Sequence, residues 1–213
     1  MLIHTHAGSH LLRVQVYEYL REQMSIGILE PGSAISVNKM IQEIGVSRTP
    51  LREALLLLQE QGFVTILPQR GVKINKLTVE GARHIYQILG ALESTVILTV
   101  FDKIGPSVIE EMKRLNERMA EAIEKNEIDQ YYRINIDFHD LFLKLSDNER
   151  LLENVRIQKM LLYDFPGRNY GKDWNIKNIR EHEAFVELIE AGEAKAAADY
   201  MRDVHWEFSR LQN

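Results

Sequence analysis

The chain has 213 residues, with 26 Lys and Arg against 31 Asp and Glu, and it contains no cysteine. This length leaves room for two modest domains, and the lack of cysteine excludes a disulfide framework and a thiolate metal site. A net charge of −5 argues at first against a nucleic-acid partner. Because we identify neither a secretory signal nor an apolar run long enough to cross a bilayer, we expect a cytoplasmic protein without a membrane partner.

The first 45 residues predict a helix followed by the start of a helix-turn-helix. Residues 11–25 place apolar side chains at helical spacing. Pro31 and Gly32 mark a turn, and a short second helix is expected over residues 36–44, where Gly45 separates it from a third helix. Two short helices joined by a tight turn that contains glycine form a helix-turn-helix.

The third expected helix begins after Ser47, a favourable N-cap residue. Arg48 and Arg52 are four residues apart and therefore share a face near its beginning, beside the Thr49 hydroxyl. The opposite face carries four apolar residues at helical spacing, which are Leu51, Ala54, Leu55 and Leu58. Two arginines and a hydroxyl in this position are typical of a helix that reads the DNA major groove. The alternative is a capped surface helix with two solvated arginines.

A β-hairpin is expected directly after the third helix. Residues 63–67 and 72–74 are rich in β-branched and aromatic side chains, and they flank a turn at residues 68–71. A hairpin beside a helix-turn-helix makes a winged helix. Arg70 and Gly71 would then lie at the tip of the wing, within reach of a DNA groove or backbone.

The charge is unevenly distributed along the chain. Residues 1–76 contain eight Lys and Arg and six Asp and Glu, a net charge of +2, whereas residues 77–213 contain 18 basic and 25 acidic residues, a net charge of −7. Phosphate binding depends on the field at the contact surface more than on the total charge. We therefore expect a DNA-binding domain over residues 1–76 and an acidic second domain over residues 77–213.

The second domain shows helical periodicity and no convincing strand. The expected helices cover residues 78–103, 107–126, 129–145, 148–165, 174–190 and 193–211. The predicted fold class is therefore mostly α, with an N-terminal winged helix-turn-helix and a C-terminal all-α bundle of six to seven helices.

Three of the seven histidines fall on inward-facing positions of three different helices in this bundle. These are His139, His182 and His205. Imidazoles from separate helices converge in the metal sites of helical bundles. The alternatives are core histidines that bond to their neighbours, or a dry ligand pocket. The other histidines give no such pattern, because His84 is expected on an exposed face and the rest lie near the N-terminus at positions 4, 6 and 10.

The first domain resembles a known family. The segments ILEPG, EIGVSRTPLREALLLLQEQGFV and QRGVKI occur in the order found in GntR-type bacterial transcription regulators, over about residues 10–76. The resemblance implies operator contacts at the recognition helix and at the glycine of the wing, with a further contact from the start of the second helix. The candidate DNA-binding residues are Lys39, Ser47, Arg48, Thr49, Arg52, Arg70 and Gly71.

The second domain resembles the effector domain of the FadR subfamily, the FCD domain, through GALE and FHDLFLKLSDNERL. This resemblance implies a divalent ion held by an Asp-x-x-x-His pair and by one histidine from each of two later helices. The corresponding residues are Asn135, His139, His182 and His205. The amide oxygen of Asn135 shares a face with His139, but loss of the usual carboxylate weakens a divalent site. Zn²⁺ and Ni²⁺ suit such ligands.

The effector is less well defined by the sequence. Relatives often have an arginine four residues before the glutamate of the ALE element, and here that position is Leu89. Arg133, Arg156 and Tyr163 are candidate pocket residues, because arginine suits a carboxylate ligand. Each is equally a candidate for a surface residue.

These patterns predict a ligand-responsive transcriptional regulator, with repression as the expected outcome. A homodimer would bind a pseudo-palindromic operator in double-stranded DNA. A small organic effector, with carboxylates among the candidates, would bind in the helical domain at one divalent ion per chain. The alternatives are a regulator that responds to the metal itself and a metal-dependent hydrolytic enzyme. No nucleophile or paired base accompanies the histidines, so we expect no enzymatic activity.

Overall fold

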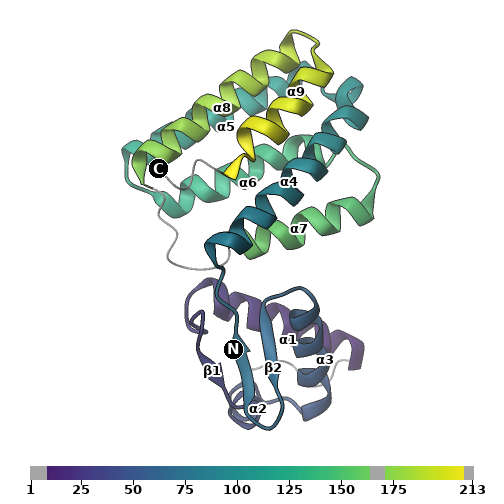
Figure 1. The fold of residues 1–213 in the computed structure, drawn as a ribbon, viewed down its shortest axis with the longest axis vertical. Helices are drawn as coiled ribbons and strands as arrows, with labels where there is room; N and C mark the ends of the chain where they lie inside the picture. The colour runs from purple at the N-terminus through teal and green to yellow at the C-terminus, as the bar shows by residue number, and fades with distance from the viewer. Residues whose placement is uncertain (1–8, 164–170, 209–213) are drawn as a thin grey trace. The chain divides into compact units, whose positions relative to one another are not determined.

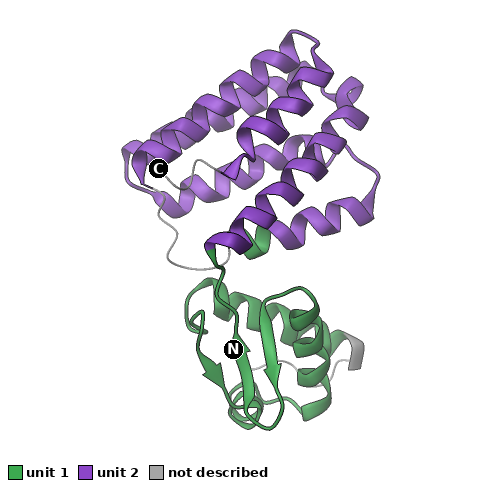
Figure 2. Ribbon diagram, viewed as in Figure 1, with its two compact units in different colours: residues 1–78, 159–168 green, residues 79–158, 169–213 purple. Residues whose placement is uncertain are grey.

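The computed structural model describes residues 9–163 and 171–208, and the chain forms two compact units (Figures 1 and 2). The first unit comprises residues 1–78 and 159–168, and the second comprises residues 79–158 and 169–213. Helices dominate both units, and the described strands form one small sheet. The predicted fold class, a winged helix-turn-helix followed by an all-α bundle, is confirmed.

The first unit has the element order of a winged helix. Its elements are α1 (Ser9–Ser25), β1 (Ala34–Ile35), α2 (Val37–Ile44), α3 (Arg48–Glu60), β2 (Val64–Leu67) and β3 (Gly71–Ile74). The strands are antiparallel in the order β1-β3-β2. The predicted hairpin is β2 and β3, whereas β1 was not predicted because two residues are too few to show a strand pattern.

Helix α3 buries one face in the core of this unit. Its four apolar residues Leu51, Ala54, Leu55 and Leu58 are at most 2% exposed. Helix α1 packs against α3 and contributes Val16, Leu20 and Met24 to the same core. Burial of this face leaves the charged face of α3 at the surface.

The second unit is a helical bundle. Its elements are α4 (Val79–Val100), the 3₁₀ turn η1 (Phe101–Lys103), α5 (Pro106–Glu124), α6 (Ile128–Leu143), α7 (Glu149–Tyr163), α8 (Lys172–Glu190), α9 (Ala194–Tyr200) and the π-helical turn η2 (Met201–His205). Helix α5 packs against α6 and α8, and α4 packs against α9 and η2 (Figure 1). The last predicted helix differs from the expectation, because it is α-helical only to Tyr200 and then widens into η2. Its predicted end at residue 211 lies outside the described residues.

Gly90 allows α4 to approach η2 closely. A Cβ atom at this position would lie 3.1 Å from the Cβ of Trp206 and 3.2 Å from the backbone oxygen of Arg202. Few Cβ atoms make contacts this short, so any larger residue would push the two segments apart. The absence of a side chain at position 90 therefore helps to fix His205 and Trp206 against α4.

One described segment, Val79–Lys103, is long and apolar enough to cross a membrane by length and composition. No segment of this kind was expected from the sequence. Half of its apolar window is buried inside the protein, and the core helix of a bundle meets the same criterion.

Candidate DNA-binding surface and candidate metal centre

The predicted contact residues of the recognition helix lie together at the beginning of α3. Ser47 is the N-cap residue, in an extended conformation, and its side chain makes no capping hydrogen bond. Ser47, Arg48, Thr49 and Arg52 are all exposed, whereas Pro50 between them is buried. The helix therefore holds two guanidinium groups and two hydroxyls at the surface while its other face is fixed in the core.

Arg48 is held by a neighbouring helix. Its Nη2 donates a 2.8 Å hydrogen bond to Oδ1 of Asn38, near the beginning of α2. Lys39, the predicted contact next to it, is exposed and forms an ion pair with Glu43 at 3.6 Å. The start of the second helix was predicted to contact DNA, but nothing in the sequence indicates that Asn38 positions Arg48. That relation depends on the angle between the two helices.

The wing is the third part of this surface. Arg70 is exposed in the turn between β2 and β3, next to Gly71. Gly71 has a φ of +99°, and a Cβ atom there would overlap the backbone oxygen of Ile35 in β1. Gly71 is therefore required for the pairing of β1 with β3, and this requirement accounts for the glycine whether or not it contacts DNA.

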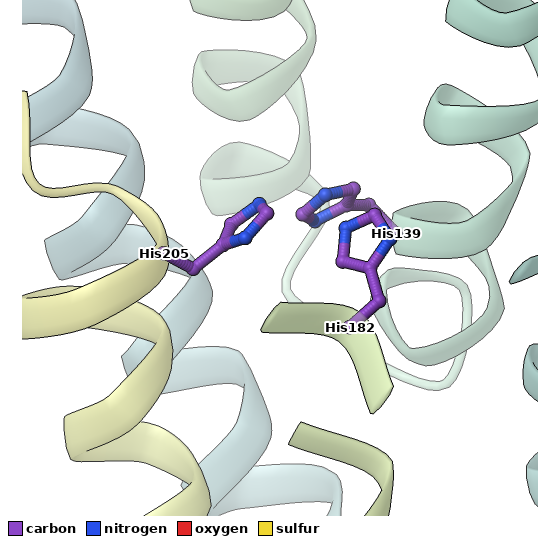
Figure 3. Close-up of side chains that lie close together, drawn as sticks. All are labelled: His139, His182 and His205. Atoms are coloured by element: carbon purple, nitrogen blue, oxygen red, sulfur yellow. The ribbon is translucent and has the colours of Figure 1, made fainter. Parts of the chain in front are cut away.

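The three predicted histidines meet in the interior of the bundle (Figure 3). His139 on α6 and His182 on α8 are fully buried, and His205 at the end of η2 is 6% exposed. One ring nitrogen from each lies within 4.8 Å of the other two. The ring of Phe138 stacks on His182 at a centroid distance of 4.0 Å and limits the movement of that imidazole.

Two of these imidazoles are oriented by acceptors from other helices. Nδ1 of His139 lies 2.8 Å from Oε2 of Glu93 on α4. Nδ1 of His182 lies 3.2 Å from Oδ1 of Asn116 on α5. When Nδ1 of a neutral histidine donates a proton, Nε2 is the nitrogen with a lone pair. These contacts favour Nε2 as the ligand atom of both residues.

Acidic residues also flank the third histidine. Nδ1 of His205 lies 3.4 Å from Oε2 of Glu181, which is on α8 next to His182. The residue after His205, Trp206, donates a 2.8 Å hydrogen bond from Nε1 to Oε2 of Glu93. Glu93 thus accepts from His139 and Trp206 through one oxygen.

Asn135, the predicted fourth ligand, is buried on α6 close to two other polar side chains, Tyr131 and Asn178. Its Oδ1 accepts a 3.2 Å hydrogen bond from Nδ2 of Asn178 on α8. The same Nδ2 donates to the Tyr131 hydroxyl at 2.8 Å, and burial raises the pKa of this phenol well above its usual value. Tyr131 is therefore neutral. The hydrogen bond from Asn178 leaves a second lone pair on the amide oxygen. The role of Asn135 as a metal ligand stays a prediction.

The structure does not bring the predicted arginines of the effector pocket to the histidines. Arg133 is exposed on α6, and Arg156 is exposed on α7, where it forms an ion pair with Glu153 at 2.8 Å. Tyr163 ends α7, and its side chain lies outside the described residues. Leu89 is fully buried in the position where relatives often have arginine.

The donor set at the cluster fits a borderline divalent ion. Three neutral imidazoles from three helices are a common ligand set for Zn²⁺. This set leaves at least one coordination position of the ion for a water or an effector. The acceptors at Nδ1 supply the outer hydrogen bonds that metal-bound histidines usually have. The sequence gave no direct sign of Glu93 or Asn116 in this role; Glu93 was noticed only as part of the GALE resemblance.

The fold defines a class of protein, a winged helix joined to an all-α domain. Two known families match the sequences of these two parts. Residues 12–74 match the bacterial regulatory proteins of the gntR family, and residues 84–205 match the FCD domain. The second match covers more than half of the chain. The chain belongs to the GntR family of regulators that carry an FCD domain, as the sequence analysis expected.

Individual relatives agree with this assignment. The uncharacterized HTH-type transcriptional regulator YdhC of Bacillus subtilis is 27% identical over 190 residues, which cover 88% of this chain and 85% of that protein. The HTH-type transcriptional repressor RspR of Escherichia coli is 29% identical over 133 residues, or 62% of this chain and 58% of that protein. The solved structure of E. coli McbR/YncC is similar in fold, with a TM-score of 0.67 at 23% identity over 95% of this chain and 99% of that one. The family and these relatives are named as regulators, which agrees with the expected lack of enzymatic activity.

Proposed function

We propose that this protein is an effector-responsive transcriptional repressor whose effector site in the bundle is centred on a divalent ion. The observation that carries the proposal is the meeting of His139, His182 and His205 inside the FCD domain of a GntR-family chain. The name of the relative RspR supports repression rather than activation. As in other regulators that act on DNA, the site of action would be the cytoplasm.

The DNA-binding part of the proposal depends on α3. Arg48 and Arg52 would contact base edges and phosphates in the major groove, with Ser47 and Thr49 on phosphates. Further contacts with DNA would come from Lys39 in α2 and from Arg70 and Gly71 in the wing. Two chains would form a homodimer, so that two recognition helices meet the two halves of a pseudo-palindromic operator.

The regulatory part depends on the bundle. His139, His182 and His205 would hold one Zn²⁺ or Ni²⁺ per chain, with Asn135 as a candidate fourth ligand. A small organic effector, with a carboxylate as the favoured chemistry, would bind beside the ion. The ion would supply the positive charge that relatives often have as an arginine at the position of Leu89. The effector changes DNA affinity only if it binds one arrangement of the protein more tightly than another.

The experiment begins with selection of duplexes from a random library by the full-length protein. Affinity for the selected operator is then measured for the wild type, for Arg52→Ala and for the control Arg114→Ala. Loss of one base-reading arginine is expected to weaken specific binding by about 1–3 kcal/mol, or about 5- to 160-fold in Kd. Arg114 is exposed on α5 beside Glu111, so its replacement should leave Kd unchanged. Unchanged operator affinity in Arg52→Ala would contradict the assigned recognition helix.

The regulatory part is tested on the same operator with zinc-loaded protein. Small carboxylic acids are added, and the Kd for DNA is measured with wild type and with His182→Ala. The proposal expects at least one acid to change the operator affinity of the wild type and to have no effect on the variant. An equal response in both proteins would place the effector elsewhere.

A further inference from the structure

Glu93 is a fully buried carboxylate in the interior of α4. A carboxylate removed from water is retained in a folded protein when donors compensate for its lost hydration. Here the donors are two aromatic N–H groups, from His139 and from Trp206, both at 2.8 Å from Oε2. His139 also meets Glu93 at ion-pair distance, with 2.8 Å between Nδ1 and Oε2.

This arrangement links three elements of the bundle at one oxygen atom. His139 belongs to α6, Glu93 to α4, and Trp206 directly follows His205 at the end of η2. The T-shaped contact between Trp206 and Tyr86, at 5.2 Å, also fixes the indole against α4. Two of the three histidines are therefore connected to Glu93, one by a direct bond and the other through its chain neighbour.

We propose that Glu93 is the positioning residue of the ion site and that it connects ion binding to α4. The inference rests on the proposed function, because it assumes that the three histidines bind an ion. Glu93 keeps the proton of His139 on Nδ1 and turns Nε2 toward the other two imidazoles. Binding of a cation at Nε2 makes the Nδ1 proton more acidic and strengthens its bond to the carboxylate.

Because Glu93 is on α4, the hydrogen bond between His139 and Glu93 connects the ion site to this helix. Helix α4 begins at Val79, where the chain leaves the first unit. An ion that tightens the bond between His139 and Glu93 therefore acts on the helix that directly follows the DNA-binding domain in the chain. Trp206 shares the same acceptor oxygen and reports on that bond.

The test uses the full-length protein and zinc alone, because Zn²⁺ is redox-inactive. The chain has two tryptophans, so Trp174→Phe leaves Trp206 as the single tryptophan, whose emission can be excited selectively over that of tyrosine. Zinc affinity and the zinc-dependent change in Trp206 emission are measured in this background with Glu93, with Glu93→Gln and with the control Glu80→Gln. Glu80 lies on the same helix but is exposed beside Arg83.

We expect Glu93→Gln to lower zinc affinity by about 10- to 100-fold, the usual effect of removing such a partner, and to remove most of the emission change. Glu80→Gln should match the parent in both. Zinc affinity of Glu93→Gln within about twofold of the parent would overturn the proposal, even if the variant unfolds at a lower temperature, because that result indicates a structural role only.

Two further outcomes are distinguishable. If the parent protein itself binds no zinc, the proposed function fails together with this inference, and the parent titration reveals it before any variant is made. If Glu93→Gln does not fold, Trp206→Phe removes the indole N–H bond to Glu93 while it keeps an aromatic ring at that position, and it is expected to lower zinc affinity by a smaller factor. Unchanged affinity in that variant would then overturn the proposal.

Discussion

The candidate DNA-binding surface and the histidine cluster are assembled in different ways. The residues at the start of α3 follow one another in the chain, and their side chains are exposed. The histidines come from α6, α8 and η2, and all three are buried. His139 and His182 each have an acceptor at Nδ1 from a further helix of the bundle. Exposed cations act through a field that salt screens, whereas buried ligands act through geometry that packing maintains.

This difference has a practical consequence for mutagenesis. Substitutions on the exposed face of α3 should change DNA affinity and leave the stability of the protein almost unaffected. Substitutions around the cluster should change ion binding and stability together, because the same contacts support both.

His182→Ala should abolish zinc binding at the cluster. The variant loses one of three nitrogen ligands and also the stacking contact with Phe138, so a lower unfolding temperature is expected as well. Zinc content is measured after dialysis, with His84→Ala as the control because His84 is exposed on α4. Equal zinc content in wild type and His182→Ala would show that the ion binds elsewhere.

Gly71→Ala should be the most damaging single change in the DNA-binding unit. Its φ is in the left-handed region, where an L-residue costs about 1–3 kcal/mol, and the overlap with Ile35 adds to this cost. Denaturant unfolding followed by circular dichroism measures the loss. Gly105→Ala is a suitable comparison, since a Cβ atom there meets nothing within 4 Å. Equal stability of the Gly71 and Gly105 variants would contradict the described pairing of β1 with β3.

Gly90→Ala tests the contact between α4 and η2. An added methyl group crowds Trp206 and Arg202, and overpacking of this kind costs about 1–3 kcal/mol. Because Trp206 and His205 shift together, zinc affinity should fall while affinity for a selected operator duplex without effector stays near that of the wild type. A variant with normal zinc affinity would indicate that the cluster tolerates movement of η2.

Asn38→Ala should have the smallest effect. Loss of the hydrogen bond to Arg48 is expected to weaken operator binding by about 0.5–1 kcal/mol, or about two- to fivefold in Kd. The loss should be concentrated at the base pair that Arg48 reads, so selection from random duplexes should show weaker preference at one position of each half-site. Lys39→Ala should instead weaken binding to all sequences and lower the salt dependence. Identical base preferences for Asn38→Ala and wild type would leave Arg48 without the proposed positioning partner.

The same contrast explains how much could be predicted from the sequence. The helix-turn-helix, the hairpin and the apolar face of α3 follow from local periodicity and turn residues, and the structure contains them. Strand β1 and the π-helical turn η2 were missed, because neither produces a local pattern: β1 has two residues, and η2 continues the composition of α9.

The candidate metal site was predicted in part. Spacing and resemblance identified the three histidines, which lie on inward faces of their helices. The partners at Nδ1 could not be predicted, since Glu93 and Asn116 are 46 and 66 residues from the histidines they contact. The hydrogen bond between Asn135 and Asn178 could not be predicted either, because it depends on the packing of α6 against α8.

The central claim is that the bundle holds an ion at the histidine cluster of a dimeric regulator. Native mass spectrometry of gently purified full-length protein, before and after zinc is supplied, tests it most directly. The account predicts a dimer that carries about one divalent ion per chain, which His182→Ala lacks. A dimer that remains free of metal when zinc is supplied would contradict the account, and the histidines would then be core or pocket residues that recognise an effector without an ion.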